Sequence, residues 1–159
     1  MPQTVILENP PRALAGLIAE AGALRYARSY RAEDVATQAI SAGQPVLKGT
    51  ADDQAKAIQD LDTVDESTLL GFVLLETSRA LEEAPPGEGD DLSVLRFGVI
   101  YLQVSDAVSA LDPVFVGNTT ATLGDIEGAA GAGLVQAPGC RFLEDAGSGE
   151  FAAAMINLA

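Results

Sequence analysis

The sequence has 159 residues, enough for one domain of ordinary size that buries a core without disulfides or a bound metal. It contains no histidine, no tryptophan and a single cysteine, Cys140, and its formal net charge is −14. These counts exclude Ser-His-Asp and Cys-His catalysis, imidazole zinc sites and an internal disulfide. The acidity argues against nucleic-acid and anionic-membrane partners, so we expect a soluble globular protein that binds neither.

The N-terminal segment 1–23 predicts an arm rather than a targeting signal. Residues 1–7 carry no lysine or arginine, and a short β-type run over Gln3–Leu7 is stopped by Asn9-Pro10-Pro11. From Arg12 to Ala23 the pattern indicates an extended or loosely helical stretch, with Leu14, Leu17 and Ile18 spaced for one helical turn. We expect this arm to be mobile in isolation and the protein to be made in a reducing cytosol.

Positive charge is concentrated near this arm. Four of the nine cationic residues lie within the first 31 positions: Arg12, Arg25, Arg28 and Arg31. Strand alternation would place Arg28 on the opposite face from Arg25 and Arg31, so they cannot form one solvated stripe. Two interpretations remain open: the arginines face an acidic partner, or they offset the protein's own acids.

Residues 24–159 are expected to form a β-rich body, because short β-branched or aromatic runs alternate with Gly, Pro, Asp and Asn. The expected strands are Leu24–Arg31, Gln44–Thr50, Leu69–Glu76, Leu92–Phe97, Val99–Val104, Asp112–Val116, Cys140–Glu144 and Phe151–Leu158. Gly98 between two of these runs predicts a bulge or sharp bend. Glu33–Ile40 is the one candidate for a helix. The predicted fold is therefore all-β or mainly β: a small barrel or sandwich with an extended arm and at most one short helix.

Two acidic clusters raise the possibility of a calcium site. One spans Asp52–Glu66 and the other spans Glu82–Asp91, within a loop rich in proline and glycine. Hard cations prefer several oxygen ligands, but neither cluster has the order of an EF-hand, so solvated loops are the favoured interpretation. A calcium- or carbohydrate-binding β-module of an adhesion protein remains the alternative function.

Catalysis has no support in the residue pattern. Dinucleotide, P-loop and CxxC motifs are lacking, and no sequence spacing establishes a pair of carboxylates for glycoside hydrolysis. Cys140 is expected to be a small buried hydrophobic residue. We therefore predict a protein that is not an enzyme and has no catalytic residues, cofactor or metal.

Several segments, in order, resemble the structural cement (head decoration) proteins of tailed bacteriophages. The longest runs from Leu92 to Val104 (LSVLRFGVIYLQV), with a valine, a basic residue and a glycine before a hydrophobic strand. The others are Arg12–Ala19, Ala42–Gly49, Leu70–Val73, Ala107–Val116 with its Asp-Pro-Val-Phe-Val ending, Gly139–Leu143 and Ala152–Leu158. The resemblance covers most of the chain from Arg12 onward.

This resemblance implies a non-enzymatic virion protein that binds the outer surface of the major capsid protein shell. It would reinforce the shell against internal DNA pressure, as a homo-oligomer and most simply a trimer, on the capsid surface after synthesis in the host cytoplasm. The candidate capsid contacts are residues of the arm and of the first expected body strand: Arg12, Leu14, Leu17, Arg25, Arg28 and Arg31.

Overall fold

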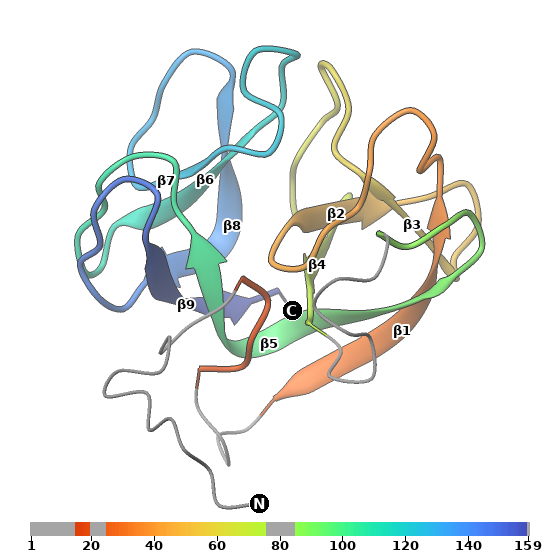
Figure 1. The fold of residues 1–159 in the computed structure, drawn as a ribbon, viewed down its shortest axis with the longest axis horizontal. Helices are drawn as coiled ribbons and strands as arrows, with labels where there is room; N and C mark the ends of the chain where they lie inside the picture. Colours follow the sequence, from red (N-terminus) through yellow and green to blue (C-terminus); the bar gives the residue numbers. More distant parts are fainter. Residues whose placement is uncertain (1–14, 20–24, 76–84, 159) are drawn as a thin grey trace, which may run out of the picture.

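The computed structural model describes residues 15–19, 25–75 and 85–158, and these residues form strands, turns and loops but no helix. Figure 1 shows two lobes side by side, with one long strand running between them. The strands are β1 (Tyr26–Glu33), β2 (Pro45–Lys48), β3 (Gln54–Ala57), β4 (Leu69–Val73), β5 (Asp91–Gln103), β6 (Pro113–Gly117), β7 (Ile126–Glu127), β8 (Leu134–Phe142) and β9 (Phe151–Asn157). The fold is thus all-β, as the sequence predicts.

The first lobe is a closed five-stranded barrel. Its strand order is β1-β3-β2-β4-β5, and β5 pairs with β1 to complete the circle. The β1–β3 pairing is parallel, whereas the other four are antiparallel. Closure leaves few unpaired edges, which suits a barrel in which β2, β3 and β4 have only four or five residues each.

The second lobe is an antiparallel sheet that shares β5 with the barrel. It continues in the order β5-β9-β8-β6-β7, and the β5–β9 ladder runs without interruption from Phe97 to Gln103. The first half of β5 therefore belongs to the barrel and the second half to the sheet, and the strand bends near its middle (Figure 1). A single strand thus couples the two lobes mechanically.

The core has two parts, one on each side of the shared wall. Neighbouring residues of the same strand alternate between them: Val46 and Val94 lie in the barrel cluster, whereas Leu47 and Leu95 lie in the larger cluster beneath the second sheet. All four side chains are buried. This is the period-two pattern of a strand that is covered on both faces.

The predicted bend at Gly98 is present as a bulge beside it. Tyr26 pairs with Phe97 and Ala27 pairs with Leu95, so the register between β1 and β5 shifts by one residue at this point. Gly98 itself has φ 136° and remains paired with β9. A bulge increases strand twist, which fits the place where β5 passes from one lobe to the other.

The predicted helix over Glu33–Ile40 is wrong. The segment completes β1 and then makes one turn, in which the amides of Thr37 and Gln38 both donate to the carbonyl of Asp34. Asp34 has φ 63°, and Ile40 is completely buried in the barrel core. Burial of Ile40 draws the chain inward before a second helical turn can form.

Residues 15–19 are hydrogen-bonded to the body. Ile18 forms an antiparallel bridge with Ile100. The amide of Gly16 donates to the carbonyl of Tyr101 (2.9 Å), and the amide of Ala19 donates to the carbonyl of Val99 (3.1 Å). This part of the expected arm is extended and attached to β5, contrary to the expectation of free mobility. Residues 1–14 and 20–24, which include the predicted strand Gln3–Leu7, lie outside the described residues.

Candidate functional site

Three of the candidate contact residues lie on β1 or directly before it. Arg25, Arg28 and Arg31 are exposed, and Tyr26 beside them is 56% exposed. The guanidinium carbon of Arg28 lies 5.3 Å from the centre of the Tyr30 ring, so Arg28 shares a strand face with this buried tyrosine. Arg31 projects from the opposite face of β1, as the alternation of the sequence predicts.

These arginines are not neutralised by ion pairs within the described part of the chain. The two salt bridges found there both use lysine: Lys48 with Asp52 at 2.6 Å, and Lys56 with Asp62 at 3.1 Å. The pKa of Asp52 is lowered chiefly by its hydrogen bond and ion pair with Lys48, and only weakly by Arg28. Among the described residues, the guanidinium groups of Arg25, Arg28 and Arg31 are thus left without an ion pair.

Leu17 lies along the same edge of β5 as the β1 arginines. Its carbonyl accepts the amide of Tyr101, and its side chain is half-buried. Three residues before Tyr101 on β5, Gly98 lies close to Arg25. The fold thus gathers four of the six candidates on one edge, while Arg12 and Leu14 lie outside the described residues.

Four carboxylates of the first acidic cluster, those of Asp52, Asp60, Asp62 and Asp65, have structural partners. Asp60 accepts the amide of Thr120 (2.7 Å), and Asp62 accepts the Nζ of Lys56 and the amide of Gln59 (3.0 Å). Asp65 accepts hydrogen bonds from Ser67 and Thr68, and these bonds lower the pKa of its carboxyl. The carboxylates therefore organise their own loop and its neighbour.

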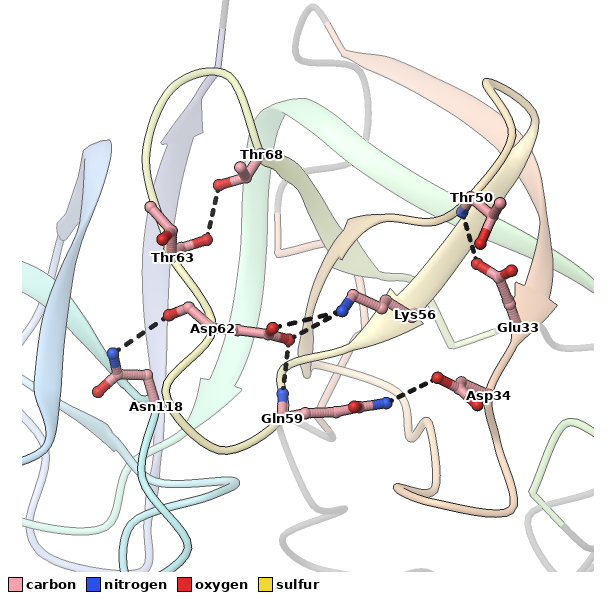
Figure 2. A network of polar contacts seen from close by, with 9 residues as sticks. All are labelled: Glu33, Asp34, Thr50, Lys56, Gln59, Asp62, Thr63, Thr68 and Asn118. Atoms are coloured by element: carbon pink, nitrogen blue, oxygen red, sulfur yellow. Dashed lines mark hydrogen bonds and ion pairs between the residues drawn. The ribbon is translucent and has the colours of Figure 1, made fainter.

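Figure 2 shows how this loop ties the two lobes together. The side-chain amide of Gln59 donates to Asp34 of the barrel lobe at 3.1 Å, and the side-chain amide of Asn118, just after β6, donates to the carbonyl of Asp62 at 3.2 Å. The amide of Leu61 donates in return to the carbonyl of Asn118 at 2.7 Å. The network braces the lobes at a place remote in sequence from their shared strand.

The second acidic cluster behaves in the same way where it is described. Glu88 accepts the amide of Val35 at 3.3 Å, and Asp90 accepts the amide of Gly87 at 2.8 Å. Glu82 and Glu83 lie outside the described residues. Within the part of the chain that the structure describes, no three His, Cys, Asp or Glu side chains are grouped so that they could hold a metal ion.

Cys140 is a small buried core residue, as predicted. Its side chain is 3% exposed within the cluster under the second sheet. Burial raises the pKa of its thiol to about 11, so almost none of it is the reactive thiolate near neutral pH. Arg141 is exposed on the next position of β8 and does not counter this effect.

Two exposed leucines were not anticipated from the sequence. Leu61 is 75% exposed and Leu111 is 69% exposed, and both have positive φ values, 61° and 76°. A non-glycine residue in this conformation is strained, which usually requires support from the surrounding fold. The only sequence signal is the aspartate that follows each leucine, and that signal is common to many turns.

Comparisons with known proteins identify the family. The family described as Structural cement protein (E217 gp24/Pam3 gp6) matches residues 1–157. A chain of the solved structure titled "The capsid of Myoviridae Phage XM1" is similar in fold, with a TM-score of 0.75 and 18% identity, over 98% of this chain and 96% of that chain. Among curated proteins, none matches this chain. Because the family match spans nearly the whole sequence, the chain belongs to the structural cement protein family, whose members have a structural role on the virion capsid.

Proposed function

We propose that this protein binds the outer surface of the major capsid protein shell and stabilises the shell against internal DNA pressure. The observation that carries the proposal is the family match over residues 1–157. The role is mechanical and needs no catalytic group, cofactor or metal. The two lobes are coupled by β5 and by the network around Asp62, so the body can bear load as one unit.

The surface that we propose for the shell comprises Arg12, Leu14, Leu17, Arg25, Arg28 and Arg31. The support for it is charge: the arginines on β1 are exposed, have no ion pair within the described residues, and belong to a protein of net charge −14. A surface of this kind attracts carboxylates of a partner, while the acidic remainder stays in solvent. Self-association, most simply as a trimer, would multiply weak contacts through avidity.

The proposal can be tested on heads assembled without this protein. Purified protein is added, and the fraction of heads that retain DNA is measured after heating or osmotic shock. We expect added protein to raise DNA retention and to sediment with the heads. No sedimentation with the heads, or sedimentation without any gain in retention, would contradict the proposal.

A matched pair of variants tests the surface. Arg28→Ala removes a guanidinium from β1, and Arg141→Ala removes one from β8 in the other lobe; both residues are exposed. We expect Arg28→Ala to weaken binding to heads and to reduce its salt dependence, with Arg141→Ala close to wild type. Equal binding of the two variants would exclude the β1 surface.

A further inference from the structure

β1 extends beyond its neighbour on one side. Its pairing with β5 covers Tyr26 to Arg31, whereas its pairing with β3 begins only at Arg31. Among the described residues, the stretch 26–30 therefore has a strand on one side alone, although the barrel is otherwise closed. In Figure 1 the start of β1 lies at the lower margin of the part that is drawn in colour. Backbone groups at such an edge are able to pair with another strand.

The hydrogen bonds show which backbone groups face the open side. The amide of Arg31 donates to the carbonyl of Asp53, on the β3 side, at 2.7 Å, whereas the amide of Ala32 donates toward the β5 side at 2.8 Å. Successive residues of a strand direct these groups to alternate edges. The N–H and C=O groups of Ala27 and Ser29 therefore point away from β5, where no described strand pairs with them.

The side chains at this edge select the kind of strand that it accepts. Ala27 and Ser29 are small and exposed, so they leave the backbone accessible. Arg25, Arg28 and Arg31 flank them on both faces without ion pairs in the described residues. Charged side chains at an edge discourage pairing with a neutral or basic strand, whereas a strand that carries carboxylates is attracted to them.

We propose that residues 26–30 of β1 take up an extended, carboxylate-bearing segment of a shell subunit as an added strand. Main-chain hydrogen bonds to Ala27 and Ser29 hold the segment, and the arginines on the two faces pair with its carboxylates. This mode of recognition gives affinity through the backbone and selectivity through alternate side chains. The inference rests on the proposed function, since it concerns how the same surface engages the shell.

Ser29→Pro tests the added strand directly, with Ser29→Ala as the matched control. Proline removes the outward N–H of this residue, and an edge strand tolerates proline where the N–H faces solvent. Alanine removes the hydroxyl and keeps the N–H. Both are added to heads assembled without the protein, and binding is measured by sedimentation over a concentration series. We expect Ser29→Pro to bind about tenfold more weakly, the upper end of what one lost hydrogen bond contributes, and Ser29→Ala to bind as wild type.

Hydrogen exchange of the wild-type protein gives a second readout that does not depend on how the proline variant folds. On shells, the amides of Ala27 and Ser29 should exchange at least tenfold more slowly than in the unbound protein. The amide of Arg31, which is already bonded to Asp53, should change little. Unchanged exchange at Ala27 and Ser29 in bound protein would overturn the added strand.

The remaining outcomes are also decisive. If Ser29→Pro folds and binds as well as Ser29→Ala, the added strand is overturned while the proposed function stands. If Arg28→Ala leaves shell binding intact and increases self-association, the arginines only prevent copies of the protein from pairing at this edge, and the inference fails. If the wild-type protein does not bind heads at all, the proposed function fails and this inference fails with it.

Discussion

Gly16 holds residues 15–19 against the body, so Gly16→Ala should release them. Gly16 has φ 79°, and a Cβ atom there would lie 2.8 Å from the backbone nitrogens of both Gly43 and Leu75. A left-handed alanine costs about 1–2 kcal/mol. The clash is with backbone, so it is relieved only if the segment moves away.

The size of the effect follows from the contacts that would be lost. Four backbone hydrogen bonds link residues 16–19 to Leu75, Val99 and Tyr101, each with a net value of about 1 kcal/mol. The backbone entropy regained by five released residues, about 1 kcal/mol each, is as large and cancels that loss, so the cost of a left-handed alanine, about 1–2 kcal/mol, sets the size of the effect. We therefore expect the free energy of unfolding to fall by about 1–2 kcal/mol and the melting temperature by about 2–8 °C. Residues 15–19 themselves should detach completely from the body.

Hydrogen exchange separates release from simple backbone strain. Gly149→Ala is the matched control, because Gly149 also has φ 79° and an added Cβ would meet nothing within 4 Å. Both variants should lose similar stability, but only Gly16→Ala should expose the amides of Ala19 and Tyr101 to rapid exchange. If those amides remain protected in Gly16→Ala, the attachment of residues 15–19 described above is incorrect.

Four further predictions test the packing and the electrostatics, two with variants and two with measurements on the wild-type protein. Gly71→Ala should lower the melting temperature or the soluble yield more than any variant above, because its Cβ would collide with the carbonyl oxygen of Leu95 in the barrel wall at φ 151°. Tyr30→Phe should leave the melting temperature unchanged or raise it, because the buried hydroxyl has no hydrogen-bond partner among the described residues. Cys140 should resist thiol reagents at pH 8 in the folded protein and react once the protein is denatured, because burial raises its pKa to about 11. The carboxyl of Asp65 should titrate below the usual 3.8 in NMR spectra; its stabilising effect is then present above that value and is lost as the pH falls through the lowered pKa.

The all-β class and most of the strands could be predicted because their residues carry the signal locally. β4, β5 and β9 are rich in apolar residues and are bounded by turn residues, so the sequence pattern and the burial agree. The Cys140 side chain is likewise buried as its residue type indicates.

The missed elements depend on contacts that are distant in sequence. β3 has the sequence QAKA, which lacks strand-forming residues, and it is a strand because β1 and β2 pair with it on either side. β7 is two residues long and is defined by its pairing with β6. In both cases tertiary pairing overrides weak local preference.

The residue types of the candidate site could be predicted from the sequence, but their arrangement in space could not. The concentration of arginines near the N-terminus, and their alternation along β1, are visible in the sequence. The overhang of β1 beyond β3 is not, because it depends on where β3 begins its parallel pairing at Arg31. The exposed backbone of Ala27 and Ser29 has no sequence signature at all.

The central claim is most directly tested by a cryo-EM reconstruction of heads assembled without this protein and then incubated with it. We expect additional density on the outer surface that accommodates both lobes, with the first residues of β1 facing the shell and the acidic remainder facing solvent. Absence of outer density under saturating protein, or density in which the second lobe contacts the shell and β1 faces solvent, would contradict the account.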